Sequence, residues 1–286
     1  MRVHFCGTRG STPAPGPEFV RYGGHTSCVA LATGAGTPAP TLLLDAGTGV
    51  RTVSALLGCQ PFRGTILLTH LHWDHILGLP FFESGDHPDA QVTLRLPAQA
   101  DGTDAESTLA RMMSPPFFPI GPHQLRGRWT FDVLPPDESA EGGFAASGFR
   151  VVAKDVPHKG GHTVGYRVTD GRHTIAYIPD HCPTQIGPGP DGWGEYHPAV
   201  LELARDVDLL IHDAHLLAEE VATQASFGHA AADYAVELGR RAGAQRVALF
   251  HHRPDRNDEA LDALVQRFSS STVPVIGAAD GLELAW

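Results

Sequence analysis

Short runs of apolar residues recur along the chain, and each is followed by a turn or a polar segment. These runs predict ten β-strands, at residues 2–6, 27–33, 41–47, 64–70, 91–97, 149–156, 163–168, 173–180, 208–214 and 246–252. Apolar residues at helical spacing predict helices at residues 50–57, 105–113, 198–206, 215–225, 229–241 and 257–268. The last helix begins with Asn257 as its N-cap, followed by Asp258 and Glu259 in its first turn.

The order of these elements indicates an α/β protein built on two sheets. Several early strands follow one another without a helix between them, and helices become frequent only later. Two packed sheets covered by helices agree with this order better than one doubly wound sheet. At 286 residues the chain is near the upper size for one core, so we expect a single domain over 1–286. Residues 114–148, rich in Pro, Gly and small side chains, are interpreted as an extended loop or insertion.

The charge balance restricts the partners that the chain can bind. The formal net charge is −11, which argues against stable binding of a nucleic-acid polymer because such binding needs clustered Lys and Arg. A small anionic substrate is still compatible with this charge, since bound divalent metals would dominate the local field. The count of 17 histidines is the unusual feature of the composition, and their spacing decides its meaning.

Cysteine usage and the apolar runs indicate a cytoplasmic protein. The four cysteines form no CxxC pair and are too widely spaced for a disulfide framework or a four-cysteine zinc site: Cys6, Cys28, Cys59 and Cys182. Free thiols in a reducing compartment are the simpler interpretation. The N-terminal residues lack an apolar signal core, and no stretch approaches 18 apolar residues, so we expect no membrane span.

The stretch LLTHLHWDHILG, residues 67–78, concentrates ligand-type residues at the end of a buried strand. Within it, His70 and His72 point to one side if the backbone stays extended, and Asp74 and His75 face a second point after the chain turns. A hydrogen-bonded polar turn is the alternative to a metal site. If the segment contained only one histidine, the polar turn would be the preferred interpretation. Four such residues at this spacing instead predict a site for zinc or a similar divalent ion.

The HxHxDH pattern after a buried strand resembles the signature of the metallo-β-lactamase superfamily, whose fold is an αββα sandwich. The resemblance extends over nearly the whole chain, and LLLDAGTGV before the motif adds to it. It implies that Asp45 contacts a metal ligand rather than the metal itself. An ordinary strand-to-helix turn is the alternative for that segment.

Later strand ends supply the remaining ligands that the resemblance implies. His158, before GYR, is similar to the pattern of the ribonuclease Z-like phosphodiesterase branch, and His162 is its rival in that segment. Asp180 follows a strand where the superfamily has a carboxylate that bridges two metals. The neighbouring His181 is interpreted as structural or close to the substrate.

The last ligand follows the strand RVALF, where the family pattern favours His251 over His252. The resemblance thus implies two divalent ions, zinc with manganese or iron as alternatives, and hydroxide formed from metal-bound water as the nucleophile. One ion would be held by His70, His72 and His158, the other by Asp74, His75 and His251, and both by Asp180.

Two further motifs favour a phosphodiesterase. LLIHDAHL contains Asp213 and FGHAAADYA contains His229, similar to the acid–histidine pair that helps protonate the leaving oxygen in ribonuclease Z-like enzymes. A helix-capping pair is the alternative for these two residues. The chain has Asp where ribonuclease Z usually has Glu, and it lacks the usual Ser-Thr after the histidine. These departures, and the absence of a basic arm between Ser114 and Gly148, argue against tRNA processing.

The sequence therefore predicts a dinuclear metal-dependent hydrolase of small phosphodiesters, with cyclic nucleotides as one candidate class and Asp74, Asp213 and His229 acting in catalysis. An acyl hydrolase (lactonase or thioesterase) and a non-catalytic ligand-sensing module are the alternatives.

The segments GTRGSTPAPG and RYGGHTSC are similar to a bacterial subgroup of small-molecule phosphodiesterase-like hydrolases. That subgroup commonly has Asn in place of His25, and this histidine either lines the pocket or fills a turn. The resemblance also implies a homodimer.

Overall fold

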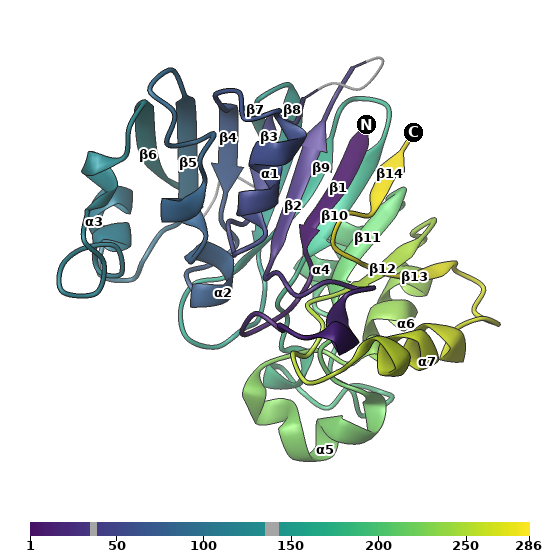
Figure 1. Ribbon diagram of the computed structural model, residues 1–286. Helices are drawn as coiled ribbons and strands as arrows, with labels where there is room; N and C mark the ends of the chain where they lie inside the picture. The colour runs from purple at the N-terminus through teal and green to yellow at the C-terminus, as the bar shows by residue number, and fades with distance from the viewer. Residues whose placement is uncertain (35–38, 135–142) are drawn as a thin grey trace.

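Two β-sheets packed face to face form the centre of the molecule, and helices cover their outer faces (Figure 1). The computed structural model describes residues 1–34, 39–134 and 143–286. Within these residues each sheet has seven strands and mixes parallel with antiparallel pairs. The four layers confirm the predicted αββα sandwich.

The first sheet joins both chain ends to the segment that carries the HxHxDH motif. Its first strands pair antiparallel, and β3 to β6 pair parallel. In spatial order it contains β14 (Glu283–Ala285), β1 (Arg2–Gly7), β2 (Cys28–Ala32), β3 (Leu42–Leu44), β4 (Arg63–Leu67), β5 (Gln91–Pro97) and β6 (Arg128–Leu134).

The second sheet is built from the later half of the chain. Its strands β10 to β13 pair parallel, whereas β7 to β10 pair antiparallel. In spatial order it contains β13 (Val275–Gly277), β12 (Val247–Phe250), β11 (Leu209–Asp213), β10 (Thr174–Ile178), β9 (Val164–Thr169), β8 (Phe149–Asp155) and β7 (Phe144–Ala146).

Seven α-helices are found in the described residues: α1 (Val50–Leu56), α2 (Trp73–Ile76), α3 (Ala105–Ala110), α4 (Pro198–Ala204), α5 (Val221–Gln224), α6 (Ala232–Ala242) and α7 (Asp258–Arg267). Short 3-10 helices are η1 (Pro17–Phe19), η2 (Leu79–Phe81), η3 (Pro122–Gln124), η4 (Pro183–Gln185), η5 (Ala218–Glu220) and η6 (Ala225–Phe227). The predicted N-cap of α7 is confirmed, because Asn257 Oδ1 accepts a hydrogen bond from the backbone N–H of Ala260 at 2.9 Å. Among the described residues, no helix has both the length and the apolar character that a bilayer crossing requires.

Three apolar layers hold the sheets and helices together. Alternate side chains of both sheets meet between them, with Phe5, Tyr177 and Phe250 in ring contact. A second cluster lies between the later sheet and α4, α6 and α7, and a third between the first sheet, α1, η2 and α3. Because burial of apolar area drives this packing, the polar residues at the strand ends are held on a rigid frame.

Two segments differ from the predictions. Residues 114–148 were expected as an extended loop, but they contain β6 and β7; residues 135–142 lie outside the described part of the chain. The strand β6 pairs with only one neighbour and is mostly half-buried or exposed, so its apolar alternation is weak. The strands β13 and β14 were also missed; each has three residues and lies at a sheet edge.

The predicted helix at 215–225 is shorter than expected. Leu216 is extended, because its N–H donates to Ala230 O and its carbonyl accepts from Ala232 N, at 3.0 and 2.9 Å. Helical residues begin only at Ala218, in η5. Helical spacing of apolar residues did not reveal this, since the pairing partner lies 15 residues further along the chain.

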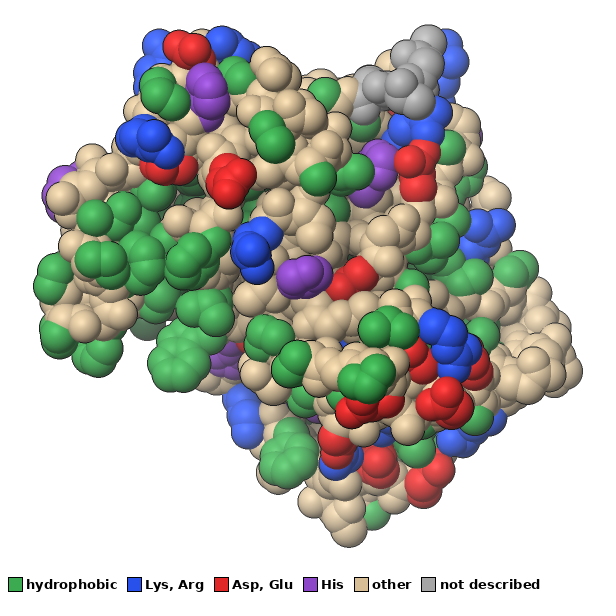
Figure 2. All heavy atoms as spheres, in the orientation of Figure 1, with side chains coloured by type: hydrophobic (Ala, Val, Ile, Leu, Met, Phe, Trp, Pro, Cys, Tyr) green, Lys and Arg blue, Asp and Glu red, His purple; other side chains and the backbone are tan. Residues whose placement is uncertain are grey.

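Hydrophobic side chains gather on the face of the molecule that carries α3 and α2 (Figure 2). Four large apolar residues on this face are exposed, and we call them the apolar patch: Trp73, Leu77, Phe81 and Phe117. Such patches on a folded domain often mark a binding site.

Candidate metal centre

Connections after the parallel strands of both sheets meet at one edge of the sandwich. The motif at 70–75 follows β4, Asp180 follows β10 and His251 follows β12, whereas His158 lies in the connection between β8 and β9. Carboxyl ends of parallel strands share an edge, so residues far apart in sequence converge there.

The structure brings all seven sequence-predicted ligands into two adjoining groups. In each group the potential ligand atoms lie within 4.8 Å of one another. The first group contains His70, His72, His158 and Asp180, and the second contains Asp74, His75 and His251.

The carboxylate of Asp180 lies between the two groups. Its Oδ1 is 3.6 Å from His158 Nε2 and 4.0 Å from His70 Nε2. Its Oδ2 is 3.0 Å from His75 Nε2 and 3.3 Å from His251 Nε2. One carboxylate therefore reaches both groups, as a bridging ligand would.

Hydrogen bonds to the other ring nitrogens orient two of these histidines. His75 Nδ1 donates to Asp45 Oδ2 at 2.8 Å, and Tyr177 donates its hydroxyl to the same oxygen at 2.9 Å. His158 Nδ1 donates to the carbonyl of Gly228 at 2.8 Å. Each bond leaves the Nε2 lone pair directed at the centre, which is how histidine ligands are held in metal sites. Asp45 thus contacts a candidate ligand rather than the centre itself.

Several buried polar atoms at the centre have no hydrogen-bond partner. Nε2 of His70, Nε2 of His75 and Oδ2 of Asp180 are among them, and the last two are 3.0 Å apart without hydrogen-bond geometry. Buried polar atoms are normally satisfied, so such a cluster calls for a bound group. Imidazole nitrogens with carboxylate oxygens form the donor set that zinc and related divalent ions prefer. The residues therefore fit two divalent cations.

The electrostatics of the centre also favour cations. Burial alone would raise the pKa of Asp180, but the neighbouring histidines, led by His251, hold it well below its usual range. Burial would lower the pKa of His75, but Asp74, Asp180 and Asp45 outweigh this effect and raise it well above the ordinary value. Carboxylates that hold a proton on a buried imidazole would hold a metal cation in its place.

Asp213 and His229 form a buried pair beside the centre. His229 Nδ1 donates to Asp213 Oδ2 at 3.1 Å and lies 3.6 Å from Asp180 Oδ1. Asp213 also accepts backbone N–H bonds from His181, His215 and Ala230, at 3.0 to 3.1 Å. The pair does not cap α6, whose N-cap residue makes no side-chain bond. Burial lowers the pKa of His229, but Asp213 outweighs it, and the net shift is upward.

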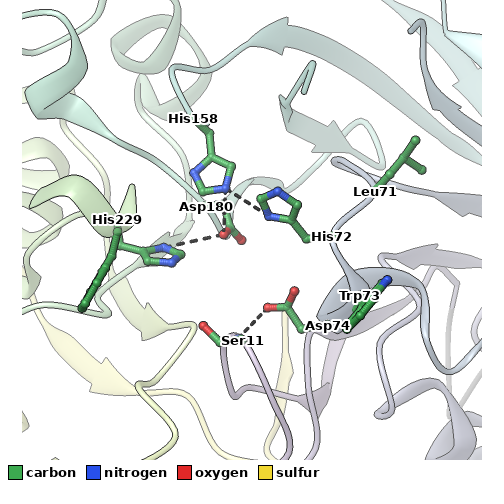
Figure 3. Close-up of a pocket in the computed structure, with 9 residues that line it drawn as sticks. Ser11, Leu71, His72, Trp73, Asp74, His158, Asp180 and His229 are labelled. Carbon is green, nitrogen blue, oxygen red and sulfur yellow. Dashed lines mark hydrogen bonds and ion pairs between the residues drawn. The ribbon is translucent and has the colours of Figure 1, made fainter. Parts of the chain in front are cut away.

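A cavity of about 410 Å³ opens over these residues (Figure 3). His158, His72 and Asp180 point toward one another at its base, with Asp74 facing them from the motif helix. His229 lines one side of the cavity, and Leu71 and Trp73 lie on the opposite side. A substrate in this cavity would contact the candidate ligands and His229 together.

Sequence reasoning missed two residues at this site. His215 stacks on His229 with 4.2 Å between ring centroids, and its Nδ1 donates to the carbonyl of His251 at 3.2 Å. Ser11 lines the cavity, and its backbone N–H donates to Asp74 Oδ2 at 2.6 Å. The histidine two positions after Asp213 was a usable signal for the first. Ser11 lies in the segment GTRGSTPAPG, whose similarity to a hydrolase subgroup did not single out this residue.

The N-terminal loop also approaches the centre closely. A Cβ added to Gly10 would lie 2.3 Å from His251 Nδ1, so only glycine fits at this position without displacing the ring. This contact explains why a glycine precedes Ser11 in the loop.

The other histidines considered in the sequence lie outside the two groups. His252 Nε2 donates to Ala278 O at 2.8 Å, His162 bonds Ala98 O and Asp155, and His181 is buried against His212. His25 Nδ1 is 3.4 Å from Thr48 Oγ1 and does not line the cavity. Of the two rival pairs, His158 and His251 belong to the clusters, and His162 and His252 do not.

Known structures identify the class of fold. The metallo-β-lactamase fold protein YhfI from Bacillus subtilis superposes with a TM-score of 0.71 at 18% identity, covering 99% of each chain. A diphosphatase from the PhnP family superposes with a TM-score of 0.68 at 17% identity, covering 100% of this chain and 97% of that one. The protein is thus built on the metallo-β-lactamase fold.

Sequence comparison identifies the family. The β-lactamase superfamily domain matches residues 41–252, which is most of the chain, and the chain belongs to this family. Ribonuclease Z from Geobacillus kaustophilus is 28% identical over 312 residues, covering 93% of this chain and 92% of that protein. The predicted superfamily and its relation to ribonuclease Z are confirmed, and the chain is a metal-dependent hydrolase of this class.

Proposed function

We propose that the protein is a dinuclear metal-dependent phosphodiesterase that cleaves small phosphodiesters, cyclic nucleotides being one candidate class. The observation that carries this proposal is the Asp213–His229 pair, which lies directly beside Asp180 and lines the cavity over both ligand groups. A phosphodiester has a poor alkoxide leaving group, and a histidine held by a carboxylate can protonate it.

Seven residues would hold the two cations in this proposal. His70, His72 and His158 would bind one, Asp74, His75 and His251 the other, and Asp180 both. Two such ions supply charge neutralisation for the phosphate oxygens and a nucleophile from water at neutral pH. Asp45 and the Gly228 carbonyl keep His75 and His158 turned toward the centre.

His229 would act as the acid in this scheme. Because its Nδ1 is bonded to Asp213, its Nε2 is left for the substrate. When protonated, Nε2 donates to the oxygen of the departing alcohol, and the buried carboxylate of Asp213 stabilises the imidazolium. His215, stacked on the same ring, restricts its orientation.

Three properties support a small substrate over a nucleic-acid polymer. The net charge is −11, the cavity of about 410 Å³ is of the size that holds a small ligand, and Asp213 stands where ribonuclease Z usually has Glu. The relative from Geobacillus kaustophilus is named ribonuclease Z, so activity on RNA is the competing outcome to be tested.

A substrate panel tests the reaction class. With divalent metal supplied, we expect bis-p-nitrophenyl phosphate to be cleaved faster than p-nitrophenyl phosphate, because the dianionic monoester needs cationic groups that the cavity lacks. The same panel includes lactones and thioesters as acyl substrates. Activity confined to lactones and thioesters, or faster cleavage of the phosphomonoester than of the diester, would overturn the proposal.

A second experiment tests the role of His229. The variant His229→Ala should keep its metal content and lose roughly a hundredfold to ten-thousandfold in rate on diesters with alkoxide leaving groups. With p-nitrophenolate as leaving group the loss should be much smaller, because that group needs little protonation. Asp213→Asn should lose less activity than His229→Ala, and its loss should likewise be larger for alkoxide leaving groups than for p-nitrophenolate. Loss of metal from His229→Ala, or an equal loss on both leaving groups, would exclude this role.

A further inference from the structure

An apolar pocket of about 550 Å³ adjoins the metal cavity, and its lining includes none of the candidate ligands and neither Asp213 nor His229. It lies between α2 and the segment that includes α3 and continues to Phe117. Its walls include Ile76, Leu77, Leu109 and Met112. On the surface this pocket coincides with the hydrophobic side chains that gather beside α3 and α2 (Figure 2).

The pocket shares part of its wall with the metal cavity. Leu71 and Trp73, which flank His72 in the HxHxDH motif, line both spaces. The indole of Trp73 is 72% exposed and forms part of the boundary between them. A molecule bound over the candidate ligands can therefore extend into the pocket without crossing a barrier of buried protein.

The polar side chains in the pocket wall already have partners. Arg111 is paired with Asp101 at 2.6 Å, and Gln99 Nε2 donates to Pro97 O at 2.8 Å. Thr108 also lines the pocket, and its hydroxyl donates to Thr103 O at 3.5 Å. The rest of the wall is hydrocarbon and aromatic, and Phe117 is 80% exposed at its rim. An occupant would gain from burial of apolar surface rather than from hydrogen bonds or ion pairs.

We infer that this pocket is a substrate subsite for an apolar ester group, so that the substrate class is a phosphodiester carrying an alkyl or aryl substituent. The inference rests on the proposed phosphodiesterase function. His229 lies on the opposite side of the cavity from Leu71 and Trp73 (Figure 3). The leaving alcohol therefore departs toward His229, and the apolar group is the one retained on phosphorus.

The reaction balances on this assignment. A water oxygen forms the new bond to phosphorus, and the bond from phosphorus to the leaving oxygen breaks. His229 supplies a proton to that oxygen, and a proton from the water replaces it. The products are one alcohol and a phosphomonoester that keeps the apolar group.

A series of alkyl p-nitrophenyl phosphates, from methyl to hexyl, tests the subsite with a constant charge and leaving group. Burial of one methylene corresponds to about a fourfold gain, and because the pocket is open to solvent we expect hexyl to exceed methyl by roughly 10- to 100-fold in kcat/KM. Equal kcat/KM for methyl and hexyl esters would overturn the subsite and leave the phosphodiesterase function standing.

Two variants localise the effect. Phe117→Ser and Met112→Ser should each lower the hexyl-to-methyl ratio of kcat/KM about three- to tenfold. Phe81→Ser is the matched control, because Phe81 is also aromatic and 50% exposed but does not line the pocket. Thermal melting verifies that all three variants fold. A ratio that neither pocket variant changes would overturn the subsite.

A binding measurement separates the subsite from catalysis. Hexylphosphonate and methylphosphonate have a P–C bond that this hydrolysis does not break, and calorimetry on the metallated protein should show at least tenfold tighter binding of the hexyl compound. If no diester is cleaved but this preference holds and Phe117→Ser removes it, the proposed function fails and the subsite stands.

The competing occupant of the apolar patch is a second copy of the chain. If Phe81→Ser and Phe117→Ser both convert a dimer to a monomer in sedimentation and both abolish the hexyl preference, the face is an interface between copies and the subsite is overturned.

Discussion

Three histidines at the metal centre engage Nδ1 in hydrogen bonds, so the position of each ring decides what its Nε2 can contact. His75 and His158 donate through Nδ1 to Asp45 and to a carbonyl, so each has Nε2 directed at the centre. His229 likewise donates Nδ1 to a carboxylate, that of Asp213, and it lines the open cavity. Because His75 and His229 both bond a carboxylate through Nδ1, the hydrogen-bond partner does not separate their roles. His75 groups with Asp74 and His251, whereas His229 groups with His215 and His251.

Asp180 gives the sharpest test at the scale of one residue. Because its two oxygens face different ligand groups, Asp180→Ala should lower the occupancy of both metal positions together, and elemental analysis of the metallated protein measures this. Asp155→Ala removes an exposed carboxylate that lies outside both groups and is the matched control. Loss of only one metal equivalent from Asp180→Ala would show that the carboxylate does not bridge.

At the scale of elements, the loops at the ends of the neighbouring strands β14, β1 and β2 are tied to one another. Asp280, in the turn before β14, accepts the backbone N–H of His25 before β2 at 2.9 Å and the hydroxyl of Thr8 after β1 at 3.1 Å. Burial raises the pKa of Asp280 to about 6, although these hydrogen bonds and Arg9 lower it. The turn is thus held by a carboxyl group that is costly to ionise.

This carboxyl group predicts a pH dependence of stability. The folded pKa is about 6 and lies above the unfolded value of about 4, so the stabilisation is complete below pH 4 and is lost as the pH rises through 6. The loss amounts to roughly 2–3 kcal/mol. Asp280→Asn should therefore gain about this much relative to the unmodified protein between pH 4 and pH 7, measured by denaturant unfolding. Asp155→Asn is the control, and parallel stability curves for Asp280→Asn and the unmodified chain would contradict the prediction.

At the scale of the whole molecule, the acidic surface decides which substrates can approach. With a net charge of −11, the chain should bind pre-tRNA no more tightly than roughly 10⁻⁴ to 10⁻⁶ M at physiological salt. Pre-tRNA cleavage should be weak under conditions in which small diesters turn over, and the ribonuclease Z of Geobacillus kaustophilus provides the control protein. Cleavage of pre-tRNA at the rate of that control would contradict the expectation of a small substrate. The homodimer that the resemblance implies stays a prediction.

Much of the architecture could be predicted because its signals are local. Apolar runs at the spacing of strands located ten of the fourteen strands in the described residues, and the sandwich followed from the order of strands and helices. The strands β6, β7, β13 and β14 escaped notice because edge strands bury few side chains and so lose their alternation. The helix expected at 215–225 was too long because the pairing of Leu216 with Ala231 is not a local property.

The sequence by itself determined the HxHxDH motif, the strand ends that carry candidate ligands and the superfamily, because a motif and a buried strand are written in consecutive residues. Only the tertiary structure showed that His158 and His251 belong to the ligand groups and that His162 and His252 do not, since this depends on where a side chain points after the strand ends. It also revealed His215, Ser11 and the apolar pocket beside Trp73. These features arise from the packing of segments that are not neighbours in the sequence, for which one sequence contains no periodic signal.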